Sequence, residues 1–245
     1  MNTPTLHEPS HGASRAPLAG QIAEQIVTQL MQSSAKPGDL LPSEAKLVVQ
    51  FGASRPIVRE ALKHLEGQGI VEVINGRGTL VRPLDESQLH AYFSHAIAIE
   101  RLPFREIMEA RKPIEVQSAR LAAQRRTPEQ FEAMQDIIRR MRRNIGLADQ
   151  YVDLDHELHA LIADATRNTI IMHLVHALRG ALNTLTQNTL YRRRNRQQLE
   201  RVHLLHESIV SEIGYGNADA AGRAMDMHFS EALAFLIERQ ESVRR

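Results

Sequence analysis

Basic side chains at helical spacing are the first feature of this sequence that could perform chemistry. Arg55, Arg59 and Lys63 recur every fourth residue, so they would share one face of a helix. A guanidinium group can bind guanine O6 and N7 with two hydrogen bonds or hold a phosphate, which suits the major groove of DNA. An amphipathic helix with a merely solvated charged face is the alternative. The face opposite the basic residues is apolar: Ile57, Val58, Ala61, Leu62 and Leu65.

Histidine is the second feature, with 12 in the chain. Asp155 and His159 are one helical turn apart, and His206 and His228 fall on the apolar faces of two later predicted helices. A buried carboxylate without a partner is costly, so an inward Asp requires a cation or hydrogen-bond donors. Three imidazoles and one carboxylate could hold a divalent ion, and Zn, Ni, Co, Mn and Fe all remain open. Each His taken alone could instead be a satisfied core residue.

A hydrolytic metal site is a weaker interpretation. Two His flank Glu157 at positions 156 and 159, but zinc proteases use His-Glu-x-x-His, which is one residue longer. No Ser/His/Asp arrangement or phosphate-binding loop stands out either. The sequence therefore predicts a protein that is not an enzyme.

Arg111 is a candidate for binding an acidic effector. It falls on an inward stripe with Ile107, Ile114 and Leu121, where a guanidinium could clamp a carboxylate. The alternative is an ion pair within the helix with Glu115, four residues later.

Composition limits the class of protein. The chain has 245 residues, enough for two domains, and a net charge of +1, so a DNA-binding role must depend on local charge. It contains no Cys, which suits a reducing cytoplasm, and no apolar run of membrane-spanning length. An aromatic content of 4% argues against stacking on single-stranded nucleic acid. A cytoplasmic protein without membrane contact is predicted.

The first part of the chain predicts a winged helix-turn-helix domain over residues 16–83, after a disordered tail at 1–15. A helix ends before Pro37, a second begins after the cap Ser43, and Gly52 turns the chain into the basic helix, for which Ser54 is the expected N-cap. Two β-branched runs, 70–74 and 79–81, flank an Asn-Gly pair that favours a hairpin tipped by Arg77. A plain structural turn is the alternative to a DNA-contacting wing.

The remaining chain predicts a linker with a connecting helix at 84–102 and an all-helical domain at 103–240. Apolar residues at helical spacing, broken by Pro, Gly and Asn, give an antiparallel bundle. The fold class is therefore mainly α, with one small β-hairpin as the wing. The expected helices are 103–124, 128–145, 149–165, 169–191, 197–213 and 218–239.

Several ordered motifs resemble the GntR-type winged-helix regulators. They are PGDLLPSE at 37–44, FGASR at 51–55, VREAL at 58–62, GI at 69–70 and GRGT at 76–79. The resemblance implies DNA contacts by Ser54, Arg55, Arg59 and Gly76, to which Arg77 is added from its hairpin position. The family usually has Arg where this chain has Ala45, so Lys46 is expected to substitute as a phosphate contact, without a guanidinium's fork geometry.

The helical part resembles the FadR-type C-terminal domain, called FCD, over about residues 105–236. Its metal-bearing members have Asp-x-x-x-His followed by single His on two later helices, matching Asp155, His159, His206 and His228. Asn168 occupies the place of a pocket Asn, although a helix-cap role competes with that assignment.

Together these features predict a homodimeric transcriptional regulator, a repressor, that binds a near-palindromic double-stranded operator. A small organic or sugar acid bound at the metal would control it. The alternative keeps the DNA-binding role and makes the metal structural or itself the signal.

Overall fold

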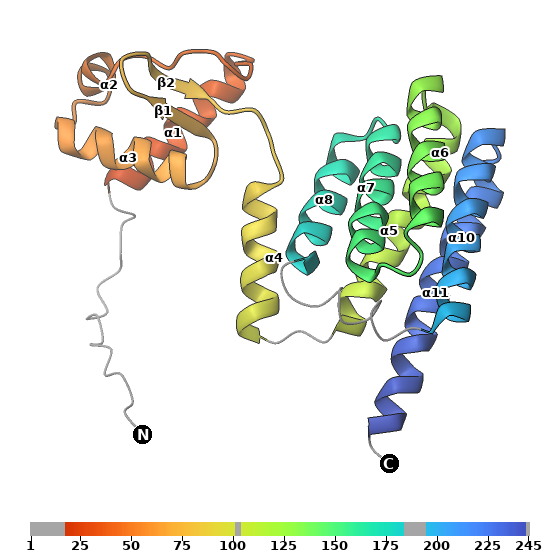
Figure 1. Ribbon diagram of the computed structural model, residues 1–245. Coiled ribbons are helices and arrows are strands. Elements are labelled where there is room, and N and C mark those ends of the chain that lie inside the picture. The colour runs from red at the N-terminus through yellow and green to blue at the C-terminus, as the bar shows by residue number, and fades with distance from the viewer. Residues whose placement is uncertain (1–17, 101–103, 184–194, 244–245) are drawn as a thin grey trace, which may run out of the picture. The chain divides into compact units, whose positions relative to one another are not determined.

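The computed structural model describes residues 18–100, 104–183 and 195–243 (Figure 1). The chain forms two compact units, Met1–Asp85 and Glu86–Arg245. The predicted tail at 1–15 lies outside the described residues. Across the described ranges, no helix combines the length and apolar character needed to cross a membrane.

The first unit is a winged helix-turn-helix, as predicted. Its elements are α1 (Leu18–Gln32), α2 (Glu44–Phe51), α3 (Arg55–Gly67), β1 (Val71–Ile74) and β2 (Gly78–Val81). Ser43 caps α2 by accepting a hydrogen bond from Lys46 N, and Gly52 ends it in the left-handed conformation that glycine adopts without strain. One apolar core joins the three helices to the hairpin, with Ile22, Leu47 and Leu65 among its fully buried side chains.

The predicted hairpin is present, with a three-residue connection between its strands. β1 and β2 pair antiparallel with Val71 opposite Val81 and Ile74 opposite Gly78, so three residues connect the strands. Gly76 and Gly78 have positive φ, but Asn75 does not. The Asn75-Gly76 pair therefore lies within a three-residue connection and does not form a two-residue type I′ turn, which would require positive φ at both central residues.

The second unit is a bundle of helices lying side by side (Figure 1). The described helices follow the predicted pattern, although the predicted end of the fourth, 184–191, lies outside the described residues. Capping boxes begin α6 at Thr127 and α10 at Asn195, and Gly216 ends α10 in the left-handed conformation. The helices are α4 (Ser87–Glu100), α5 (Phe104–Arg125), α6 (Pro128–Arg143), α7 (Ala148–Ala165), α8 (Thr169–Asn183), α10 (Arg196–Tyr215) and α11 (Ala218–Val243).

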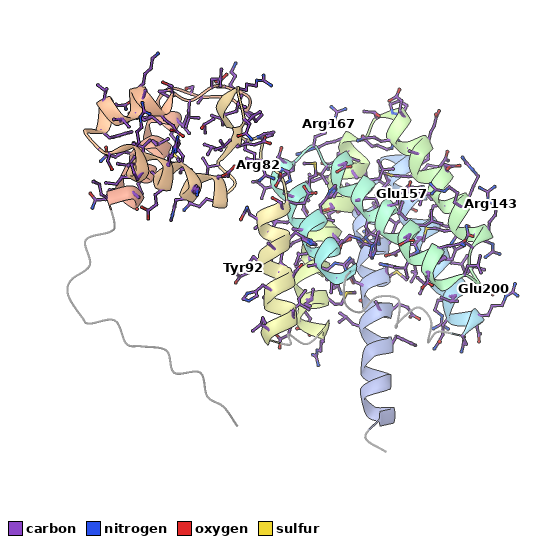
Figure 2. All side chains as sticks on the ribbon, turned by 60° about the vertical axis from the view of Figure 1, so that its left-hand side comes forward. Arg82, Tyr92, Arg143, Glu157, Arg167 and Glu200 are labelled. Carbon is purple, nitrogen blue, oxygen red and sulfur yellow. The ribbon has the colours of Figure 1, made fainter. Side chains whose placement is uncertain are left out.

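Helix α5 is central to the bundle and packs against α7, α8, α10 and α11. The core includes Met134, Tyr151, Leu158, Ile209 and Phe229, all essentially without solvent exposure. Charged residues such as Arg143 and Glu157 lie on the outside (Figure 2).

Helix α4 belongs to the second unit. The sequence predicts a linker with a connecting helix at 84–102, and in the structure the helix of this segment, α4, packs along α8, where His90 is half-buried. A Cβ added at Gly180 of α8 would lie only 2.7 Å from His90 Nδ1, so the missing side chain at Gly180 permits this close contact.

Candidate DNA-binding and metal sites

Helix α3 presents a basic face to solvent. Val58, Ala61, Leu62 and Leu65 point into the core, which leaves Arg55, Arg59 and Lys63 exposed on the other side. Pro56 lies in the first turn of α3, where its missing N–H leaves no helical hydrogen bond unmade. Ser54 occupies the N-cap position, but its side chain makes no capping hydrogen bond.

A carboxylate on the preceding helix contacts this face. Arg59 Nε donates a 2.9 Å hydrogen bond to Glu44 Oε2, with the two side chains 62% and 39% exposed. Neighbouring Ala45 and Lys46 are also exposed. The wing residues Gly76 and Arg77 are exposed at the hairpin turn, where Arg77 N donates to Ile74 O. All six residues predicted to bind DNA therefore lie on the first unit and outside its core.

The four predicted metal ligands converge in the second unit. Asp155 and His159 come from α7, His206 from α10 and His228 from α11, and all four are buried. One ligand atom from each lies within 4.8 Å of the others. His206 Nε2 is 2.9 Å and His159 Nε2 is 3.7 Å from Asp155 Oδ1, so one carboxylate oxygen faces two imidazoles.

The buried nitrogens of this cluster fit a cation. His159 Nε2 and His228 Nδ1 lie in the interior without a hydrogen-bond partner among the described residues, and His206 Nε2 faces the Asp155 carboxylate. Unsatisfied buried polar atoms are costly, and neutral imidazole with carboxylate is a ligand set for Zn and neighbouring divalent metals. Such ions bind imidazole nitrogen and carboxylate oxygen at about 2.0–2.2 Å. The ligand atoms of one site must therefore lie within a few ångströms of one another, as the atoms of this cluster do.

A second layer of side chains contacts the four candidate ligands. Glu115 of α5 makes a short contact with His159 Nδ1, leaving His159 Nε2 to face Asp155. Arg179 of α8 donates a 2.5 Å hydrogen bond from Nη2 to Asp155 Oδ2, and its Nη1 lies 3.5 Å from Glu115 Oε2. Tyr151 Oη lies 3.2 Å from His206 Nδ1. Such outer contacts fix the tautomer and ring orientation of metal-binding His.

Burial and neighbouring charges shift the pKa values of two residues in this cluster. Burial alone would raise the pKa of Asp155. The electrostatic attraction of Arg179 and His159 for its carboxylate is larger than this effect and holds the pKa well below its usual value. Burial and the proximity of His206 and His159 hold the pKa of His228 well below its usual value. Asp155 is therefore a carboxylate and His228 a neutral imidazole at neutral pH, the protonation states that bind metal.

Arg111 is buried on α5, as predicted, and its guanidinium group pairs with Glu115. Arg111 Nη2 lies 2.6 Å and Nε 2.8 Å from Glu115 Oε1, which is the competing interpretation from sequence. Asn168 caps α8, because its Oδ1 accepts hydrogen bonds from Ile170 N and Ile171 N. Effector binding by these two residues stays a prediction.

Sequence reasoning missed several residues of this region. The sequence patterns do not identify Arg179 or Tyr151, and they indicate Glu115 only as a partner for Arg111. His203, also missed, is buried with Nε2 3.1 Å from Glu207 Oε1. A usable signal existed for Arg179, because it lies on the apolar stripe of α8 with Val175, Leu178 and Leu182.

Comparison with known proteins agrees with this division of the chain. The family model described as bacterial regulatory proteins, gntR family, matches residues 18–81, and the FCD domain model matches residues 106–231. The HTH-type transcriptional regulator LutR of Bacillus subtilis is 30% identical over 197 residues, covering 80% of this chain and 90% of LutR. The Glc operon transcriptional activator of Escherichia coli K12 is 29% identical over 199 residues, covering 77% of this chain and 78% of the activator.

A solved structure supports the fold. The Streptococcus agalactiae GntR structure has a TM-score of 0.66 at 22% identity, covering 88% of this chain and 99% of that chain. The matched families and relatives are transcriptional regulators rather than enzymes. The chain is a member of the GntR family of bacterial regulatory proteins, in the group that carries a C-terminal FCD domain.

Proposed function

We propose that this DNA-binding transcriptional regulator works as a homodimer and responds to a small acid at a metal centre. The observation that carries the proposal is the buried convergence of Asp155 with three imidazoles in the second unit. Such a cluster is costly to keep in a core unless it binds something.

In the first unit, α3 enters the major groove. Arg55 and Arg59 have the side-chain type that recognises guanine, and both are exposed. Two copies would place two such helices in the half-sites of a near-palindromic operator. Contacts to the DNA backbone around these two residues would come from Ser54, Lys46, Gly76 and Arg77.

In the second unit, Asp155, His159, His206 and His228 hold a divalent ion. A bound ion supplies positive charge and coordination positions for the oxygen atoms of a carboxylate or hydroxy acid. Effector binding changes operator affinity only if the acid binds one conformational state better than the other.

A structural or signalling metal is the second candidate, and one observation favours it. The guanidinium groups of Arg111 and Arg179 are already paired with Glu115 and Asp155. Neither is free to clamp an acid without breaking a buried ion pair, which is strongly unfavourable.

One experiment separates these candidates. Operator binding by the metal-loaded protein is titrated with organic and sugar acids, and in parallel with Zn²⁺ and a chelator. We expect an acid to shift the operator Kd at constant metal. A Kd that responds to metal and chelator but to none of the acids would support the second candidate.

The metal ligands are tested by composition. His206→Ala should lower the metal content of the purified protein, whereas His64→Ala, an exposed His of α3, should leave it unchanged. Full metal retention by His206→Ala would remove that residue from the site.

The direction of control is tested separately. Repression is the expected direction of control, while the Escherichia coli relative is named an activator. A reporter driven by the bound promoter should rise on deletion of the regulator if it represses. A fall on deletion would identify an activator.

A further inference from the structure

We propose that Glu44 is a specificity-determining residue that orients Arg59 for reading a base rather than a phosphate. The inference rests on the proposed role of Arg59 in DNA binding. It starts from the ion pair between α2 and α3, since that contact joins the residue predicted to read DNA to a carboxylate on another helix.

The geometry leaves the recognition edge of the guanidinium free. Glu44 Oε2 accepts from Arg59 Nε, while neither Arg59 Nη group has a hydrogen-bond partner among the described residues. The two Nη groups can therefore still give the paired hydrogen bonds that match guanine O6 and N7. Fixing Nε restricts a long and flexible side chain, so less conformational entropy is lost when a base is bound.

Glu44 is itself held in place. It is the first residue of α2, directly after the Ser43 cap, and α2 packs against α3 in the same core. A carboxylate in the first helical turn is favoured by the helix dipole. The anchor for Arg59 is thus attached to a rigid element rather than to a loop.

The charge of Glu44 adds discrimination. A carboxylate beside Arg59 repels the phosphate backbone, which lowers sequence-independent affinity at this position. The neutral edge of a guanine is not repelled in the same way. The Glu44–Arg59 pair should therefore bind the correct base in preference to a nearby phosphate. The specificity arises because the carboxylate makes the phosphate contact less favourable.

The test uses the full-length, metal-loaded protein. A duplex selected by this protein from a random pool is compared with a scrambled duplex of equal composition, and both Kd values are measured by fluorescence anisotropy over a range of salt concentrations. Glu44→Gln removes the charge and Glu44→Ala removes the partner. Glu60→Gln is the matched control, because Glu60 is exposed beside Arg59 in sequence and carries the same charge.

We expect both Glu44 variants to bind the scrambled duplex more tightly than the wild type does. The specificity ratio, which is the Kd for the scrambled duplex divided by the Kd for the selected duplex, should fall roughly 10-fold. The salt dependence on the scrambled duplex should steepen, because Arg59 becomes available to a phosphate. Glu60→Gln should keep the wild-type ratio. In an Arg59→Ala background, Glu44→Gln should no longer lower the ratio.

Two failures are distinguishable. If Arg59→Ala lowers the ratio but Glu44→Gln and Glu44→Ala leave it unchanged, the orienting role of Glu44 is wrong and Arg59 still reads DNA. If Arg59→Ala itself has no effect, the proposed placement of Arg59 is wrong, and the role of Glu44 is rejected with it.

Discussion

The hydroxyl of Tyr151 offers a direct test of the contacts that surround the proposed metal ligands. Its hydroxyl lies 3.2 Å from His206 Nδ1, and deleting it preserves the ring that fills the core. Tyr151→Phe should weaken metal binding by about 10-fold, since outer contacts orient ligand imidazoles. Competition with a chelating dye measures the affinity. Tyr92→Phe, on the exposed side of α4 (Figure 2), is the control, and an equal loss there would contradict the assignment.

His176 should give the bundle a pH-dependent stability that is independent of the metal ligands. Its Nε2 lies 3.0 Å from Asp164 Oδ1, and this contact raises the pKa of His176 above 6.5. Its stabilising effect is therefore complete below about pH 6.5 and is lost as pH rises through the folded-state pKa. The pair is partly exposed, so we expect roughly 0.5 kcal/mol.

Asp164→Asn is the variant that checks this pH effect. Urea unfolding from pH 5 to 8 should show the wild type losing more stability than Asp164→Asn as the pH rises. Parallel stability curves for the two proteins would show that the pair contributes nothing.

For single residues, the sequence predicts which side chains share one face of a helix better than it predicts which side chains meet across two helices. Asp155 and His159 share a helical face, and the inward position of His206 follows from its own helix. The pairing of Arg179 with Asp155 depends on how α8 packs against α7, which no spacing within either helix specifies. Glu115 shows the same limit, because it contacts both Arg111 and His159.

At the scale of whole elements, α4 packs against α8, and Gly180 lies against His90 in this interface. In Gly180→Ala the new Cβ would lie 2.7 Å from His90 Nδ1, so the imidazole or the helix must move. We expect a loss of about 1–3 kcal/mol from overpacking and faster hydrogen exchange across residues 87–100. Combining the change with His90→Ala should restore much of the loss.

Gly20→Ala in α1 provides the contrast. An added Cβ there meets nothing within 4 Å, so this variant should gain up to about 1 kcal/mol from helix propensity. If Gly180→Ala were equally stabilising, α4 would not be held by the close contact at Gly180.

Helix boundaries were predictable because caps are local. Thr127 with Gln130 and Asn195 with Gln198 form capping boxes that can be recognised in sequence, and α6 and α10 begin there. The packing of α4 against the second unit was not predictable from sequence, because Pro83 and the following polar residues resemble a linker. Its packing partner α8 is about 80 residues away along the chain.

At the scale of the molecule, the chain carries its two predicted tasks in separate compact units, with the division after Asp85. The sequence predicts the division after residue 83 because the hairpin ends the winged-helix pattern there. Each unit has its own apolar core. Each core can therefore unfold as a separate cooperative transition.

Metal should stabilise one of these transitions and leave the other unchanged. The four candidate ligands come from α7, α10 and α11, all within Glu86–Arg245. Free Zn²⁺ at 100 times its Kd should add about 2.7 kcal/mol to the unfolding free energy of that unit, because the unfolded chain lacks the assembled site. Calorimetry with Zn²⁺ and then with chelator should move only the bundle transition. In His228→Ala that transition should stop responding, and a Zn²⁺-dependent shift of the winged-helix transition would place metal binding outside the Asp155 cluster.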